Sequence, residues 1–436
     1  MFRRSAASTA MLASVGEIEQ YTSWILGMAI AVNVFFQAHV KLPGGLINVN
    51  LADPLALLAL TATTLHLWFA KQYPAWRIDR FNLALAMMSV MWLLAFLNGW
   101  TAIGVTQWAL AGRLVGWLVL LGYLSAGYLI VTNIGPHGLR RFAETVVSVA
   151  VVIVIMQVIL RLLEQWEVHT GVHRTPNFEG YAGNRNAFAF QLLTTVSLLL
   201  GYFGIYARGE KLNQHFLRRW FPEILLGILW VALIWTGSRM GVIAGLAMLL
   251  IEWFLRPSSR RSLYWSVATA ALLWFFAWTA SQESLITSVL TGQFSSIRFE
   301  KNPMQMVSPE TSNQERLATL IHGFDLWLQS PLFGAGLGVF NAKSSSWFGH
   351  PQVIHSTPFW ILTECGLLGL IVVGWSLFLL ARYATQRQSQ PSQRILLLLL
   401  SAFFIFGLAH EILFQRIFWL VLGAVLAQPF SSRVSA

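Results

Sequence analysis

The chain has 436 residues, of which 56% are hydrophobic and only 11% are charged, and its mean hydropathy is +0.60. A soluble domain carries about 25% charged residues, so this composition excludes an ordinary soluble protein and indicates a surface that largely faces lipid. The net charge of +11 does not indicate nucleic-acid binding, because the basic residues are scattered between apolar runs and no run of five or six appears. The single cysteine, Cys365, cannot form an internal disulfide.

Apolar segments recur along the whole chain. A helix needs roughly 20 apolar residues to cross about 30 Å of hydrocarbon. We predict about twelve spans, and therefore an all-α, polytopic transmembrane bundle that forms one membrane domain over residues 1–436. The first span is expected to act as an uncleaved signal anchor, since residues 1–20 contain no continuous apolar core. The predicted spans are 21–40, 52–70, 82–99, 108–131, 140–163, 185–207, 222–237, 239–256, 262–281, 357–383, 394–412 and 414–430.

The distribution of Lys and Arg gives the expected orientation. With a cytoplasmic N-terminus, 18 of the 29 basic residues fall in inner segments and 10 in outer segments, while Arg113 lies within a span. Because short cytoplasmic loops carry the excess of Lys and Arg, we expect both termini to be cytoplasmic. Two outer segments, Glu164–Asn184 and the 75-residue Gln282–Ser356, are too polar to insert. Loops as long as 282–356 are uncommon unless they are functional.

The large outer loop contains one predicted helix, from Asn313 to Leu328, which Ser330-Pro331 ends. Its apolar residues recur at helical spacing: Leu317, Leu320, Ile321, Phe324 and Leu328. The glycine-rich run 334–338 superficially matches a nucleotide-binding loop, but it follows a helix rather than a strand. A turn that docks the loop helix against the membrane domain is the favoured interpretation.

Three arginines, Arg185, Arg239 and Arg316, are predicted at or near the outer interface. Arginine binds phosphate oxygens bidentately and stays charged, so guanidinium groups that converge on one outer cavity would suit a diphosphate. The alternative for Arg239, which lies in the tight hairpin Thr236-Gly237-Ser238-Arg239, is a side chain that reaches lipid headgroups.

His355 ends the large loop and is a candidate general base or hydrogen-bond donor. The alternative for His355 is an interfacial histidine bound to a backbone carbonyl. In that case a loop glutamate is the alternative base. Glu364, about two turns into the next span, either orients a partner or pairs with a polar neighbour inside the bundle. The only aspartates are Asp53, Asp79 and Asp325, so no acidic cluster indicates a bound metal, and no cofactor is expected.

Several motifs occur in order around the large loop. They are Gly183-Asn184-Arg185-Asn186-x-Phe188-Ala189, Ser238-Arg239-x-Gly241, Arg316-x3-Leu320-x2-Gly323-x3-Trp327-x2-Ser330-Pro331-Leu332-Phe333-Gly334-x-Gly336-x-Gly338-x-Phe340, His355, and Glu364-x-Gly366-Leu367-Leu368-Gly369-Leu370. Together they resemble the O-antigen ligase/polymerase superfamily over about 190 residues. One departure is that His-Asn is common in that superfamily where this chain has His355-Ser356.

The resemblance implies a bacterial inner-membrane glycosyltransferase with the C-type membrane fold. Such enzymes move a glycan from undecaprenyl diphosphate to an acceptor on the periplasmic face. By carry-over, Arg239 and Arg316, with Arg185, would bind the donor diphosphate, and His355 would act at the acceptor hydroxyl. Asn186 and Glu364 would support them.

The leading hypothesis is an O-antigen ligase that joins a lipid-linked polysaccharide to lipid A–core by a metal-independent, inverting transfer. The alternatives with the same chemistry are an O-antigen polymerase and a protein O-oligosaccharyltransferase. A transporter or flippase of lipid-linked sugars is an alternative of a different class. It predicts inverted repeats and a site at the membrane midplane. The expected partners are the lipid-linked donor, the lipid A–core acceptor and membrane lipids, but no nucleic acid.

Overall fold

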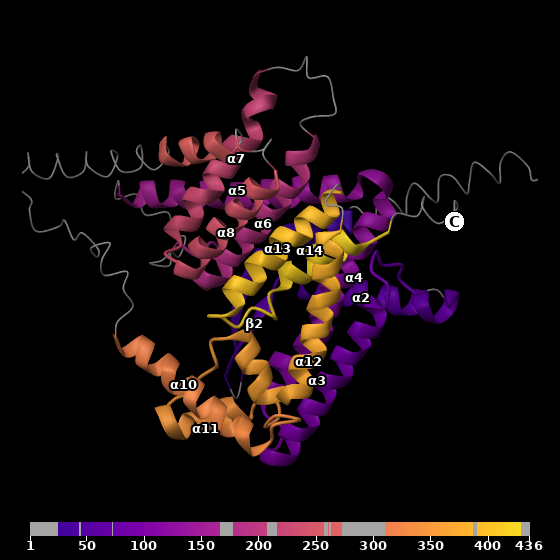
Figure 1. Ribbon diagram of the computed structural model, residues 1–436, viewed down its shortest axis with the longest axis vertical. Coiled ribbons are helices and arrows are strands. Elements are labelled where there is room, and N and C mark those ends of the chain that lie inside the picture. The colour runs from indigo at the N-terminus through magenta and orange to yellow at the C-terminus, as the bar shows by residue number, and fades with distance from the viewer. Residues whose placement is uncertain are drawn as a thin grey trace, which may run out of the picture.

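Apolar helices account for most of the fold, as the composition requires. The structure is a computed structural model that describes residues 25–42, 45–71, 73–165, 178–206, 216–256, 260, 263–272, 310–386 and 390–428. The longer helices are α2 (Asp53–Ala70), α3 (Phe81–Ile103), α4 (Gly116–Ile134), α5 (Gly138–Gln165), α6 (Arg185–Tyr206), α7 (Phe216–Trp235), α8 (Arg239–Leu255), α10 (Glu310–Gln329), α11 (Val339–Phe348), α12 (Thr357–Thr385), α13 (Pro391–Gly407) and α14 (Arg416–Leu426) (Figure 1). A π-helical segment, η1 (Trp108–Val115), leads into α4, and a 3-10 turn, η2 (Gly135–His137), follows it.

Four helical segments in the described part of the chain are long and apolar enough to cross a membrane. They are Phe81–Ile103, Trp108–Ile134, Gly138–Arg161 and Thr357–Thr385. Shorter apolar helices include Pro222–Trp235, Pro391–Gly407 and Arg416–Leu426. The architecture is therefore that of an all-α membrane protein, but the predicted number of twelve spans is not confirmed.

The first predicted span, 21–40, is wrong in its second half. Residues 25–33 are helical, but β1 (Gln37–Leu42) and β2 (Gly45–Asn50) form an antiparallel hairpin that pairs Gln37 with Asn50. The sequence between the strands contains Pro43-Gly44, a pair that disfavours helix continuation and favours a turn. The Gln37 N–H donates to the Tyr181 carbonyl at 2.8 Å, which ties the hairpin to the segment before α6.

Parts of two predicted loops and of several predicted spans lie outside the described residues. The span 262–281 is described, and helical, over 263–272. Residues 282–309 of the large loop and 166–177 of the shorter loop are not described. Within the large loop, α10 confirms the predicted helix and ends at Gln329, immediately before Ser330-Pro331.

Helix α4 packs closely between α2 and α14 in the centre of the fold (Figure 1). Two glycines permit the closest approach: a Cβ on Gly127 would collide with the Leu420 carbonyl, and one on Gly423 with the Leu124 carbonyl. Small residues at helix crossings let backbones approach in this way in membrane proteins.

Helix α12 is broken at Gly366, where φ is 69°. The segment between α10 and α11 fills the break. The N–H groups of Ala335 and Gly336 donate to the carbonyls of Thr363 and Glu364 at 2.8 and 3.0 Å. In return, the N–H groups of residues 367 and 368 donate to the carbonyls of residues 331 and 332 at 2.9 and 3.1 Å. Backbone groups away from water need such partners, so this exchange fixes the large loop to the membrane helices.

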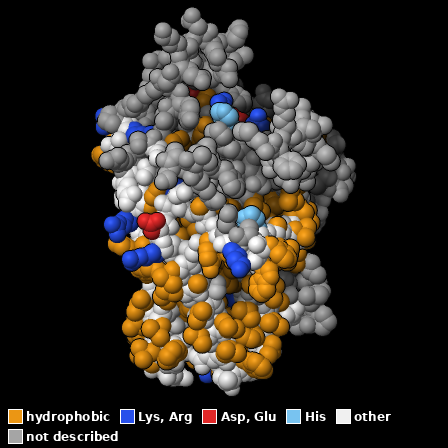
Figure 2. All heavy atoms as spheres, turned by 90° about the vertical axis from the view of Figure 1, so that its right-hand side faces the viewer, with side chains coloured by type: hydrophobic (Ala, Val, Ile, Leu, Met, Phe, Trp, Pro, Cys, Tyr) orange, Lys and Arg blue, Asp and Glu red, His pale blue; other side chains and the backbone are white. Residues whose placement is uncertain are grey.

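The surface and one internal groove are strongly apolar. Hydrophobic side chains cover most of the lower half of the face in Figure 2, with few charged groups among them.

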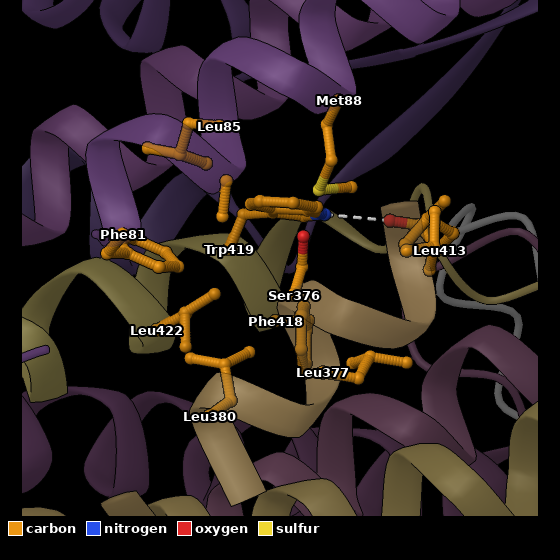
Figure 3. Close-up of a pocket in the computed structure, with 12 residues that line it drawn as sticks. Phe81, Leu85, Met88, Ser376, Leu377, Leu380, Leu413, Phe418, Trp419 and Leu422 are labelled. Atoms are coloured by element: carbon orange, nitrogen blue, oxygen red, sulfur yellow. Dashed lines mark hydrogen bonds between the residues drawn. The ribbon is translucent and has the colours of Figure 1, made fainter. Parts of the chain in front are cut away.

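A groove of about 20 Å³ lies between α3, α12 and α14 (Figure 3). Its polar groups are satisfied internally, because the Trp419 indole donates to the Leu413 carbonyl at 2.7 Å and the Ser376 hydroxyl to the Val372 carbonyl at 2.9 Å. With no charged side chain in its lining, the groove offers no group for catalysis.

Candidate active site

Arg185 and Arg239 are the first residues of α6 and α8. The side chain of Asn184 accepts the Asn186 N–H at 2.7 Å before α6, and the Ser238 hydroxyl accepts the Gly241 N–H at 3.2 Å to cap α8. Both arginines are exposed. A helix N-terminus already carries partial positive charge. A cation at each of these positions is therefore unfavourable for the helix and favourable for a bound anion.

The two helix starts lie next to each other. The Arg185 guanidinium lies 3.7 Å from the position that a Cβ on Gly237 would occupy, and Gly237 is two residues before Arg239. The tight turn predicted at 236–239 is confirmed, with φ of 64° at Gly237. The turn therefore brings two of the three predicted arginines to one end of the bundle.

Arg316 lies half-buried in the first turns of α10, and its charge reaches His355 in the loop before α12. Burial, and after it the Arg316 charge, lowers the pKa of His355 from its ordinary value of 6.5. The carboxylates of Glu411 and Glu315 act in the opposite direction. A histidine in this setting is neutral at pH 7 and can accept a proton.

His410 is a member of this group that the sequence analysis missed. Burial lowers its pKa to about 4, with further contributions from the charges of Arg316, His355 and Arg185. The loop is anchored at Thr357, whose hydroxyl donates to the His410 carbonyl at 2.8 Å and accepts the Ile412 N–H at 3.0 Å. The sequence analysis placed this residue inside the predicted span 394–412, but α13 ends at Gly407. The adjacent polar residues His410 and Glu411 could have indicated that the span ends before them.

Glu411 makes a buried ion pair with Arg113. The guanidinium donates to both carboxylate oxygens, at 3.1 and 2.8 Å. It also lies over the rings of Trp108, Trp360 and Phe414, with 4.1, 4.6 and 4.7 Å from its carbon to the ring centroids. Arg113 belongs to the π-helical segment η1, and such segments often occur at functional sites. The pair holds the loop that carries His410.

The side chain of Glu364, on α12, is fully buried. The Gly338 N–H and the Trp360 indole N–H donate to its two carboxylate oxygens, at 3.2 and 2.9 Å. It therefore pairs with polar neighbours inside the bundle, which is one of the two predicted alternatives, and it holds the glycine-rich turn. The docking of that turn is confirmed, since the Leu337 N–H also donates to the Ala95 carbonyl of α3 at 2.8 Å.

Asn186 and the three predicted arginines have few side-chain contacts with the described residues. Asn186 contributes its backbone N–H to the Asn184 side chain, and no hydrogen bond from its own side chain is found in the described residues. Arg185, Arg239 and Arg316 likewise form no ion pair with a carboxylate in the part of the chain that the structure describes. Within the described ranges, these three positive charges therefore have no carboxylate counter-ion.

Residues 224–374 match the protein-family model described as O-antigen ligase. The match includes Arg239, Arg316, His355 and Glu364, while Arg185 lies before it. No curated protein matches the chain. The match supports a function of the O-antigen ligase/polymerase type, in a family of glycosyltransferase-like enzymes of lipopolysaccharide assembly. Residues 224–374 are thus similar to the O-antigen ligase superfamily.

Proposed function

We propose that the protein is an O-antigen ligase of the bacterial inner membrane. It transfers a polysaccharide from undecaprenyl diphosphate to lipid A–core, at a site on the periplasmic face, with both termini in the cytoplasm. The transfer is metal-independent and inverts the anomeric carbon.

The observation that carries this proposal is the set of three arginines for which the described residues offer no carboxylate partner, with Arg316 close to His355. Arg185, Arg239 and Arg316 come from three different helices, and His355 is close enough to Arg316 for its pKa to respond. A diphosphate carries several negative oxygens, and bidentate guanidinium contacts suit them. No carboxylate of the described residues needs to be displaced from these three side chains when the donor binds.

The reaction requires charge stabilisation and one proton acceptor. The acceptor hydroxyl oxygen attacks the anomeric carbon while the bond from that carbon to the diphosphate oxygen breaks. The electron pair of that bond leaves with the diphosphate, where the arginines stabilise the developing charge. The hydroxyl proton passes to the imidazole of His355. Glu315, which is exposed on α10, is the alternative base, whereas Glu411 is engaged by Arg113.

Three alternatives remain. An O-antigen polymerase would use the same donor but a second lipid-linked glycan as acceptor, and a protein O-oligosaccharyltransferase would use a protein hydroxyl. A flippase would bind the donor without cleaving it. The fixed arginines and the proton acceptor favour transfer over translocation, and the acceptor chemistry is resolved by experiment.

The test is reconstitution of purified protein with undecaprenyl-diphosphate glycan and lipid A–core, without ATP and with EDTA. We expect glycosylated lipid A–core and free undecaprenyl diphosphate. Elongated lipid-linked glycan would identify a polymerase instead. Transport of intact donor without product would contradict the proposal, and a requirement for metal would contradict its metal-independence.

Variants connect the product to the site. Arg316→Ala and His355→Ala are expected to lose most of the transfer while their thermal unfolding remains that of the parent. Arg382→Ala, at the other end of α12, is the matched arginine control and should retain full transfer. Full transfer by both site variants would contradict the assigned roles.

A further inference from the structure

An apolar stripe lies on the exposed side of α10. Leu317, Ile321, Phe324 and Leu328 follow one another at i, i+4, i+7 and i+11, which places them on one face of the helix. All four are between 44% and 60% exposed. A contiguous apolar face of this kind marks an interaction surface, because folded proteins rarely leave one in water.

The other two faces of α10 are accounted for. Thr319, Gly323 and Leu326 are buried, and the Thr363 hydroxyl of α12 donates to the Gly323 carbonyl at 3.3 Å. Asp325 and other exposed polar residues form a second face. Their full set is Gln314, Glu315, Asp325 and Gln329. One face of α10 therefore packs against the rest of the protein, the second face is polar and suited to contact with water, and the apolar stripe forms the third face.

The stripe is continuous with the lipid-facing surface of a membrane helix. Leu332 and Phe333, just after α10, are exposed. The backbone at Leu332 accepts the N–H of Leu368 on α12, and Pro331 accepts that of Leu367. Those two leucines are also exposed, on a helix that is long and apolar enough to cross a membrane. The apolar surface thus passes from α12 to α10 through direct hydrogen-bonded neighbours.

We propose that α10 lies at the membrane–water interface on the outer side of the membrane that α12 crosses, with its apolar stripe in contact with lipid. Helices with one apolar and one polar face bind at the headgroup level in this orientation. Figure 1 places α10 beside the end of the pair formed by α3 and α12. Trp100, near the outer end of α3, is also exposed, and tryptophan concentrates at membrane interfaces. This inference does not rest on the proposed function.

The position has a consequence for Arg316. This residue immediately precedes Leu317 on α10, so a stripe held in lipid keeps its guanidinium at the headgroup level. A lipid-linked anion presents its phosphates at that level. The loop helix is then a membrane-anchored support for one side chain of the site, rather than an arm that moves freely in water.

The test uses single cysteines in the full chain, with the buried Cys365 replaced by Ala. A bimane fluorophore is placed at Ile321 or Leu328 on the stripe, and at Asp325 or Gln329 on the polar face. Phe378 of α12, 60% exposed, is the lipid-facing control. The proteins are reconstituted in nanodiscs of phosphatidylethanolamine and phosphatidylglycerol, with and without a lipid that carries a nitroxide near the top of its acyl chain.

We expect the nitroxide lipid to quench the stripe labels at least threefold more than the polar-face labels, and to a degree similar to position 378. Aqueous iodide should quench in the opposite order. Stripe labels that iodide reaches and nitroxide lipid does not would overturn the proposal. Stripe labels shielded from both quenchers would also overturn it, because another protein surface would then cover the stripe. Thermal unfolding of each labelled protein verifies that the fold is retained.

Discussion

The arginines at the ends of the helices fall into two groups that differ in their counter-charges. Arg113 and Arg416 are each held by a carboxylate, Glu411 and Asp53, with donor–acceptor distances of 2.6–3.1 Å. In the second group, Arg185, Arg239 and Arg316, no carboxylate partner is found among the described residues. A partnered arginine inside a protein stabilises the packing of two elements, whereas an open one near the surface can bind an anion. Residue type alone does not tell which arginine belongs to which group.

The largest expected effect comes from removing an open guanidinium. Arg316→Ala should lower transfer by about 10²–10³-fold, the usual cost of losing one donor that stabilises developing charge. Arg316→Lys should recover only part of that loss, because an ammonium group cannot bind two oxygens in the same plane. The measurement is the initial rate of product formation in proteoliposomes, with Arg382→Ala as the control. An Arg316→Ala protein with unchanged thermal stability and unchanged rate would break the distinction between the two groups.

The partnered group should respond in stability. Arg113→Met leaves Glu411 without its partner in a site where the two side chains are only 9% and 16% exposed, so we expect about 3–5 kcal/mol less stability. Replacing both residues, Arg113→Met with Glu411→Leu, should recover much of this loss, because no uncompensated charge remains. Unfolding in detergent by urea measures the difference. Equal stability of the single and double variants would show that the pair is not what holds this loop.

Local sequence patterns located the open group but not its partnered counterpart. Arg239 and Arg316 stand in short motifs, and the helix around Arg316 follows from apolar residues at helical spacing. The Arg113–Glu411 pair joins residues 298 positions apart, so no local periodicity indicates it. His410 was missed for a related reason, since the apolar run 394–412 contains it although α13 ends at Gly407.

The fold shows the same division between local and distant determinants. Most predicted spans coincide with helices to within a few residues, because continuous apolar runs leave few other choices. The hairpin at residues 37–50 was not predicted, since its strands pair with each other and with the segment before α6 only in the tertiary structure. The break of α12 at Gly366 could not be predicted either. It depends on backbone groups of residues 331–336, which fill it.

The pH dependence of transfer distinguishes the two histidines beside the open arginines. The pKa of His355 lies below 6.5, so the imidazole is neutral and competent as a base at pH 7. Protonation removes this competence as the pH falls through that pKa. We expect the midpoint of the acidic limb to lie below pH 6.5, with the rate falling by up to tenfold per pH unit beneath it. The rate measured at saturating donor and acceptor reports it.

A substitution at the second histidine is the control for that profile. The pKa of His410 is about 4, so His410 stays neutral through the whole range, and His410→Gln should leave the position of the acidic limb unchanged. A limb centred above pH 6.5 would contradict the environment assigned to His355. A limb that survives in His355→Gln would assign the proton transfer to a carboxylate such as Glu315.

The smallest expected effect concerns Glu364, which accepts a hydrogen bond from the Trp360 indole that lies under Arg113 and belongs to the framework of the fold. Glu364→Gln keeps one acceptor oxygen for two donors, the Gly338 N–H and the Trp360 indole, so one buried N–H loses its acceptor. The expected cost is about 1–3 kcal/mol of stability, with a transfer rate per folded molecule within twofold of the parent. Trp360→Phe removes one of the donors, so the double variant should be less destabilised than the sum of the single changes. A loss of rate comparable to that of Arg316→Ala, in a protein of normal stability, would instead place the Glu364 carboxylate in the reaction itself.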